Sequence, residues 1–127
     1  MAGSVLFIHQ NFPGQFRHLA PRLQAMGHRC RAIAAPQAPG LADITLHRYA
    51  LPQPPPAQAI HPWARDLQTK CLRAEAVARQ ALALQQQGFQ PDLVIGHPGW
   101  GELMAIKDVF QEALVWHQLE FVYQLEG

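Results

Sequence analysis

Residues 4–34 read SVLFIHQNFPGQFRHLAPRLQAMGHRCRAIA, and this stretch decides the fold. Its almost continuously apolar start, at 4–8, predicts a strand buried on both faces. Apolar residues then recur every three or four positions across 14–27, which predicts a helix that ends at Gly27. We expect Pro21 to kink this helix or to split off its first turn. A second strand at 29–34 completes a βαβ unit. The apolar stripe of the helix consists of Phe16, Leu19, Leu23 and Met26.

The rest of the chain continues the alternation of strands and helices. Residues 36–56 are rich in proline, which leaves space for only a short strand at 44–49. The longest helical pattern covers 61–87, and Gly88 is positioned to end it. Further strands are expected at 92–96 and 113–116. The stripe of the long helix consists of Leu67, Cys71, Ala74, Ala78, Ala81 and Gln85. A short helix at 101–110 is expected to place on one face Leu103, Ile106 and Phe110.

This pattern predicts the α/β class. We expect one Rossmann-like domain over 1–127, with an open, mostly parallel sheet of about five strands and helices on both faces. In the doubly wound strand order 3-2-1-4-5, the order reverses between the first strand and the strand at 92–96. Ligands bind such sheets beyond the carboxyl ends of the strands at that reversal, so the residues that leave these two strands are the candidates for a site.

Composition excludes several classes of function. The 127 residues carry 10 Lys and Arg against 9 Asp and Glu, a net charge of +1, which is too weak a field for nucleic-acid binding. Cys30 and Cys71 lie far apart without metal-ligand spacing, so neither a metal site nor a disulfide is indicated. No apolar run is long enough to span a bilayer and the first residues do not resemble a signal peptide, so we expect a cytoplasmic setting.

Three of the seven histidines follow predicted strands. His9 follows VLFI, His97 follows LVIG and His117 follows LVW. The topology would bring His9 and His97 to the reversal point and His117 one strand further along. Imidazoles there suit sugar hydroxyls, carboxylates or a developing charge, although each could equally bind only local backbone. The others are expected to be surface or packing residues: His18, His28, His47 and His61.

The loop after the first strand, HQNFPGQFRH, has one glycine where a dinucleotide-binding loop has three, so an NAD-dependent enzyme is disfavoured. Gly14 would let a ligand approach the backbone. The N–H groups of Gln15 and Phe16, with Arg17 beside them, would favour an anion or a hydroxyl. The loop could equally be a simple turn.

In the segment HPGWGE, at 97–102, glycines would let a ligand approach the backbone closely, and a tryptophan offers a flat ring. Gly99 and Gly101 bracket Trp100, on which a sugar could stack, although Trp100 could instead be a core anchor. Further along the chain, Phe121 and Tyr123 lie in a segment with no predicted helix or strand face that would bury them. These two aromatic residues suggest that a packing partner is missing. The sequence has no catalytic triad and no pair of carboxylates with hydrolase spacing.

With VLFIHQNFPGQFRHLAPRLQAMGH, PDLVIGHPGWGELMAIKDVF and HQLEFVYQLEG, the chain resembles the N-terminal domain of a family 4 glycosyltransferase. The resemblance implies the GT-B architecture of two Rossmann-like domains. It implies transfer of a sugar from a nucleotide-sugar donor, as co-substrate, to an acceptor with retention of anomeric configuration, and no metal or other cofactor. The partners it implies are a sugar, glycan or lipid acceptor and a C-terminal donor-binding domain, and it is compatible with peripheral membrane contact.

The resemblance identifies His97 as the cleft histidine that contacts the transferred sugar. It places the loop around Gly14 near donor phosphate and acceptor, and Trp100 and Glu102 at the acceptor pocket. His117 and Glu120 rest on their position after the last strand alone. Together with the arguments above, the expected substrate-binding residues are His9, Phe12, Pro13, Gly14, Gln15, Gly99, Trp100, Glu102, His117 and Glu120.

Two classes of function stay open from the sequence. In the first, the C-terminal donor-binding domain is absent from this chain, which is then half of a hexosyltransferase-like enzyme and inactive alone. In the second, the chain is a free-standing, flavodoxin-like binding module without catalysis. A nucleotide-binding enzyme with another chemistry is a more distant alternative.

Overall fold

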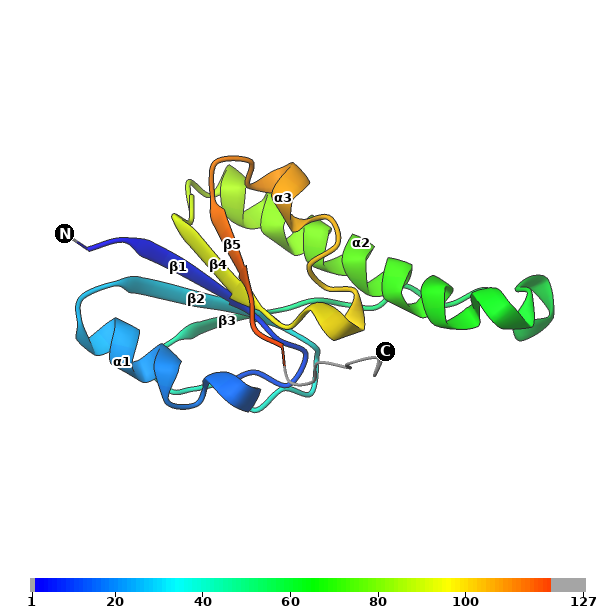
Figure 1. Ribbon diagram of the computed structural model, residues 1–127, viewed down its shortest axis with the longest axis horizontal. Helices are drawn as coiled ribbons and strands as arrows, with labels where there is room; N and C mark the ends of the chain where they lie inside the picture. Colours follow the sequence, from blue (N-terminus) through cyan, green and yellow to red (C-terminus); the bar gives the residue numbers. More distant parts are fainter. Residues whose placement is uncertain (1, 120–127) are drawn as a thin grey trace, which may run out of the picture.

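The computed structural model describes residues 2–119 and contains a five-stranded parallel sheet (Figure 1). The strand order is β3-β2-β1-β4-β5, so the order reverses between β1 and β4. This confirms the expected α/β fold and puts the carboxyl ends of β1 and β4 at the reversal point. The strands are β1 (Ser4–Ile8), β2 (Arg29–Ala34), β3 (Thr45–Arg48), β4 (Leu93–Gly96) and β5 (Leu114–His117).

The central strand β1 is buried along its whole length, as its apolar sequence predicts. Ile8, its last residue, is in register with Ile33 of β2 and with Gly96 of β4. Alternate side chains point to opposite faces of the sheet, so Leu6 and Ile8 join one core cluster while Val5 and Phe7 join another.

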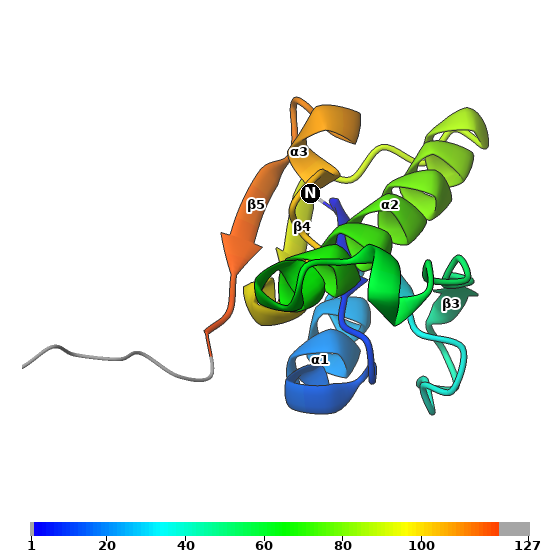
Figure 2. The ribbon, with the colours of Figure 1, turned by 90° about the vertical axis from the view of Figure 1, so that its right-hand side faces the viewer.

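Helices cover both faces of the sheet (Figure 2). Helix α1 (Leu19–Ala25) lies over the face that carries Phe7, and its Ala20 is fully buried there. Helices α2 (Arg65–Gln86) and α3 (Ile106–Val109) lie over the opposite face, where Leu84 and Ile106 share a cluster with Leu6. No helix in the described part of the chain is long and apolar enough to cross a membrane.

The segment 14–27 divides as the proline predicts. A short 3-10 turn, Gly14–Phe16, is separate from α1, which begins two residues before Pro21. Pro21 therefore lies in the first turn, where its missing N–H breaks no helical hydrogen bond. The prediction that Met26 belongs to the buried stripe is wrong, because Met26 follows the last helical residue and its side chain is exposed.

Helix α2 begins at Arg65, later than expected, because His61 and a 3-10 turn at Pro62–Ala64 precede it. Its first half extends past the carboxyl ends of the strands (Figure 1). Leu67 and Cys71 are therefore exposed, which corrects the predicted stripe. The helix buries instead a set of mostly small side chains: Ala74, Ala76, Val77, Ala81 and Leu84. Within 101–110 only α3 is α-helical, but the expected face is buried: Leu103, Ile106 and Phe110.

Candidate functional site

The rings of His9 and His97 meet at the reversal point of the sheet, with 6.0 Å between their centroids. His9 follows β1 and His97 follows β4, and the His97 N–H donates to the carbonyl of Ile8 across the strand pair. Both side chains are largely buried, at 6% and 8% exposure. The sequence therefore predicted correctly that these two histidines converge.

Each of these imidazoles accepts a hydrogen bond from the backbone two residues further on. The Asn11 N–H donates to Nδ1 of His9, and the Gly99 N–H donates to Nδ1 of His97, both at 3.0 Å. An imidazole that accepts at Nδ1 carries its proton on Nε2 when it is neutral. The two histidines thus bind the local backbone and also converge at one site. The backbone hydrogen bonds fix the orientation of the rings.

Four rings form a row along the carboxyl ends of β1 and β4, which we call the aromatic row: Phe16, His9, His97 and Trp100. Neighbouring centroids in this row are 5.8 to 6.0 Å apart. Phe16 is buried, whereas Trp100 at the other end is 40% exposed. The guanidinium of Arg73 lies 5.8 Å from the Trp100 ring centroid. The row therefore runs from the core to a surface-accessible indole beside a cation.

Two glycines allow the histidine rings to lie against the backbone. A Cβ on Gly14 would lie 2.5 Å from Cε1 of His9, and one on Gly99 would lie 2.6 Å from Cε1 of His97. Gly14 also has a positive φ of 45°. Both positions were predicted as places of close approach to a ligand, and what approaches them in this structure is a histidine ring.

The β1–α1 loop corrects part of the sequence prediction. Phe12 packs against Phe7 in the core with no exposed surface, so its side chain does not line a cleft. The Phe16 N–H donates to the carbonyl of Pro13 at 2.7 Å, and so is not available for an anion. The side-chain amide of Gln15 donates to the carbonyl of Gln118, which ties the loop to the segment after β5.

Glu102 is buried with no exposed surface, which corrects the expectation that it borders an acceptor pocket. Its Oε2 accepts a 2.9 Å hydrogen bond from the Tyr49 hydroxyl, while Oε1 is buried without a hydrogen bond within the described residues. Tyr49 directly follows β3, so the contact joins the carboxyl end of that strand to the segment after β4. Tyr49 was not predicted from the sequence, although Tyr49, like His9 and His97, is a polar residue directly after a strand.

The surroundings of Glu102 raise its pKa to about 7. Burial is the main cause, because an ionised carboxylate loses its hydration there. The Tyr49 hydrogen bond, the positive charge of Arg73 and the backbone N–H of Gln10 each lower the pKa by smaller amounts. Near neutral pH this carboxyl is therefore divided between its protonated and ionised forms.

The remaining candidates that lie among the described residues take peripheral or structural positions. His117 ends β5, opposite Gly96, and is exposed. Glu120, Phe121 and Tyr123 lie outside the described residues. His28 accepts from the Gly3 N–H, and His61 accepts from the Trp63 N–H. His18 is exposed and His47 is half-buried in β3. All four have the surface or packing positions expected for them.

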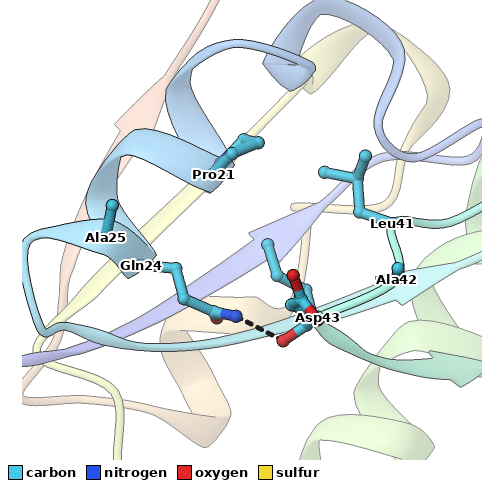
Figure 3. A pocket seen from close by; sticks show the side chains of 7 residues that line it. Pro21, Gln24, Ala25, Leu41, Ala42 and Asp43 are labelled. Atoms are coloured by element: carbon cyan, nitrogen blue, oxygen red, sulfur yellow. Dashed lines mark hydrogen bonds between the residues drawn. The ribbon is translucent and has the colours of Figure 1, made fainter.

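A cavity of about 720 Å³ adjoins the β1–α1 loop at the same edge of the sheet. Its lining includes Pro13 and Gly14 on one side and Pro39 and Gly40 of the β2–β3 connection on the other. A second cavity, of about 390 Å³, lies between α1 and the segment that leads into β3 (Figure 3). Gln24 crosses it to bond the Asp43 carbonyl. Leu41 lines both cavities, and the second contains neither His9 nor His97 in its lining.

The site can donate and accept hydrogen bonds and offers a flat indole for stacking, but the described residues contain no cluster of three or more metal-ligating side chains. Arg73 of α2 is the second residue that sequence reasoning missed. Its contact with Trp100 could not be read from the helix pattern, because periodicity does not reveal which part of α2 extends past the sheet.

Comparison with known proteins gives the same fold and adds a family. The C-terminal domain of a hydrogenase from Pyrococcus furiosus is similar over 94% of this chain and 92% of its own, with a TM-score of 0.57 and 14% identity, which shows a shared fold alone. The comparison with curated proteins gives no match. The model of the glycosyl transferase family 4 group matches residues 26–127, which include β4, the HPGWGE segment and His97. The chain therefore belongs to the glycosyl transferase family 4 group.

Proposed function

We propose that this chain is the acceptor-side domain of an enzyme that transfers a sugar, in the hexose class, from a nucleotide sugar to an acceptor hydroxyl with retention of configuration. The donor would be held by a second Rossmann-like domain in a GT-B arrangement. In the reaction, the bond from the anomeric carbon to the nucleotide phosphate oxygen breaks and a bond to the acceptor oxygen forms. The hydroxyl proton passes to the departing phosphate. No metal or other cofactor is part of the proposal.

The observation that carries the proposal is the convergence of His9 and His97 at the reversal point, in a chain of this family. His97 is the proposed catalytic residue, and it orients the transferred sugar from the end of β4. The Gly99 N–H fixes its ring and places the proton of the neutral imidazole on Nε2, a donor suited to a sugar hydroxyl. Trp100 supplies an exposed ring for stacking.

A transfer assay on the enzyme with both domains tests the proposal. His97→Ala is expected to lower turnover by about 10² or more, the usual loss when a positioned hydrogen-bonding group is removed near a reacting centre. His61→Ala is the matched control, because His61 caps a 3-10 turn before α2 and its loss leaves turnover unchanged. Equal activity of the two variants would remove His97 from the site.

The finer parts of the proposal have their own measurements. An NMR spectrum taken before the product equilibrates gives its anomeric configuration, and inversion would contradict retention. Residues 1–127 alone are expected to show no transfer, since the donor site belongs to the second domain. Ligand binding without transfer by the two-domain protein would favour a binding module instead.

A further inference from the structure

We propose that the 720 Å³ cavity beside the β1–α1 loop binds an oxyanion, a phosphate or carboxylate group of a ligand. If the chain acts in sugar transfer as proposed above, the molecule that carries this anionic group is the acceptor. The cavity is bounded by two connections at the carboxyl edge of the sheet, and its lining residues include Asn11, Pro13, Gly14, Arg17, Pro39 and Gly40.

The polar side chains of the cavity make it suited to an anion. Arg17, His18 and Asn11 line it, and none of the lining residues in the described part of the chain is acidic. Within the described residues, the side chains of these three form no hydrogen bond or ion pair with the protein. An arginine that no carboxylate of residues 2–119 pairs with offers its planar fork of donors to an incoming oxyanion, which is the geometry that phosphates and carboxylates accept.

The walls of the cavity are fixed before any ligand arrives. The Gly40 N–H donates to the carbonyl of Phe12 at 2.8 Å, which ties the two connections together. Arg48 donates to the carbonyls of Pro36 and Ala38, which holds the β2–β3 connection from its other side. A ligand would therefore order mainly the Arg17 side chain on binding, and a preformed site keeps that cost small.

The cavity is also next to His9. Gly14 forms part of its lining, and the same residue lies against the His9 ring, as the 2.5 Å separation of a Gly14 Cβ from Cε1 shows. An anionic group held by Arg17 would thus anchor a molecule whose remaining atoms lie near the carboxyl end of β1. This arrangement would position an acceptor without placing the charged group at the reacting atoms.

NMR titration of the ¹⁵N-labelled chain with inorganic phosphate, and separately with acetate, tests the inference at constant ionic strength. We expect saturable shifts at the amides of Gly14, His18 and Gly40 with at least one of the two anions. Arg17→Gln should weaken this binding about tenfold or more. Arg22→Gln is the matched control, since Arg22 is an exposed arginine on the nearby helix α1 but does not line the cavity; it should change the affinity by less than about twofold.

Three results would overturn the inference: no saturable shift with either anion, full anion affinity in the Arg17 variant, or equal weakening by the two arginine substitutions, which would indicate general charge attraction. The result is separable from the proposed enzymatic function. Sugar transfer that persists while the Arg17 variant keeps full anion affinity would overturn the anion site alone. Anion binding in a protein that transfers no sugar would overturn the enzymatic proposal alone.

Discussion

The Tyr49 hydroxyl donates a 2.9 Å hydrogen bond to Glu102, whose carboxyl has no exposed surface. These two residues follow different strands, and they lie 53 positions apart in the chain. Their contact fixes the segment after β4, which carries His97 and Trp100, against the carboxyl end of β3. The stability of the candidate site is thereby coupled to the ionisation of one buried acid.

The first prediction concerns Glu102→Gln and pH. The folded protein holds the Glu102 proton up to a pKa of about 7, whereas an unfolded chain releases it near 4.5. Between these values the folded state binds more protons, so the Glu102 contribution to the unfolding free energy falls as pH rises, by about 3 kcal/mol in total. Glu102→Gln removes this decline, which urea unfolding at pH 4.5 to 8 would detect. Glu112→Gln, at an exposed position, should keep the wild-type slope.

The second prediction concerns Tyr49→Phe, which removes the hydroxyl that donates to Oε2 of Glu102. We expect a loss of about 1 to 3 kcal/mol of unfolding free energy, the cost of an unsatisfied buried polar group. The loss should be larger at pH 8 than at pH 5, because the ionised carboxylate depends more on the donor. Chemical denaturation at the two pH values measures both effects, and an equal loss at each would contradict the second.

The third prediction separates two reasons for a glycine at position 14, its positive φ and the close contact with the His9 ring. Gly14→Ala adds a Cβ against the His9 ring at a φ of 45°, whereas Gly27→Ala adds one at a φ of 95° with no atom within 4 Å. Both variants carry the penalty of about 1 to 2 kcal/mol for a left-handed backbone. Only Gly14→Ala should lose more than this and shift the His9 imidazole resonances. Equal losses in denaturation would show that the His9 contact is unimportant.

The fourth prediction concerns Trp100→Ala in the two-domain enzyme. Since the indole is partly exposed, its loss should change the melting temperature little while raising the acceptor KM by about tenfold, as expected when a stacking surface is removed. Trp63→Ala provides the control, because Trp63 is 93% exposed and lies before α2. Steady-state kinetics with both variants would contradict the stacking role if their KM values agreed.

The sequence predicted most of the fold because its apolar patterns are strong. The bounds of β1 and β2 matched, and Pro21 marked the division of the following helix. Periodicity failed at Leu67 and Cys71, since it does not reveal where a helix leaves its sheet. Placement after parallel strands brought His9 and His97 together, because strand order alone determines which ends are adjacent.

The details of the candidate site depended on tertiary contacts that no local pattern encodes. Glu102 was expected at a pocket edge but is buried against Tyr49, a partner 53 residues away. Phe12 was expected to line the cleft, although its ring completes a core that also contains Phe7. Packing partners distant in sequence determine whether a polar residue such as Glu102 is buried and whether an aromatic residue such as Phe12 lies in the core.

The central position of β1 also sets the order in which the molecule can fold. One neighbour, β2, is available soon after β1 is synthesised, but the other, β4, begins only at Leu93. The Ser4 N–H likewise cannot donate its hydrogen bond to the carboxylate of Asp92 until that residue, 88 positions later, has been synthesised. On the ribosome, one hydrogen-bonding edge of this apolar strand therefore stays unpaired until most of the polypeptide has emerged, which exposes the strand to association with other chains during synthesis.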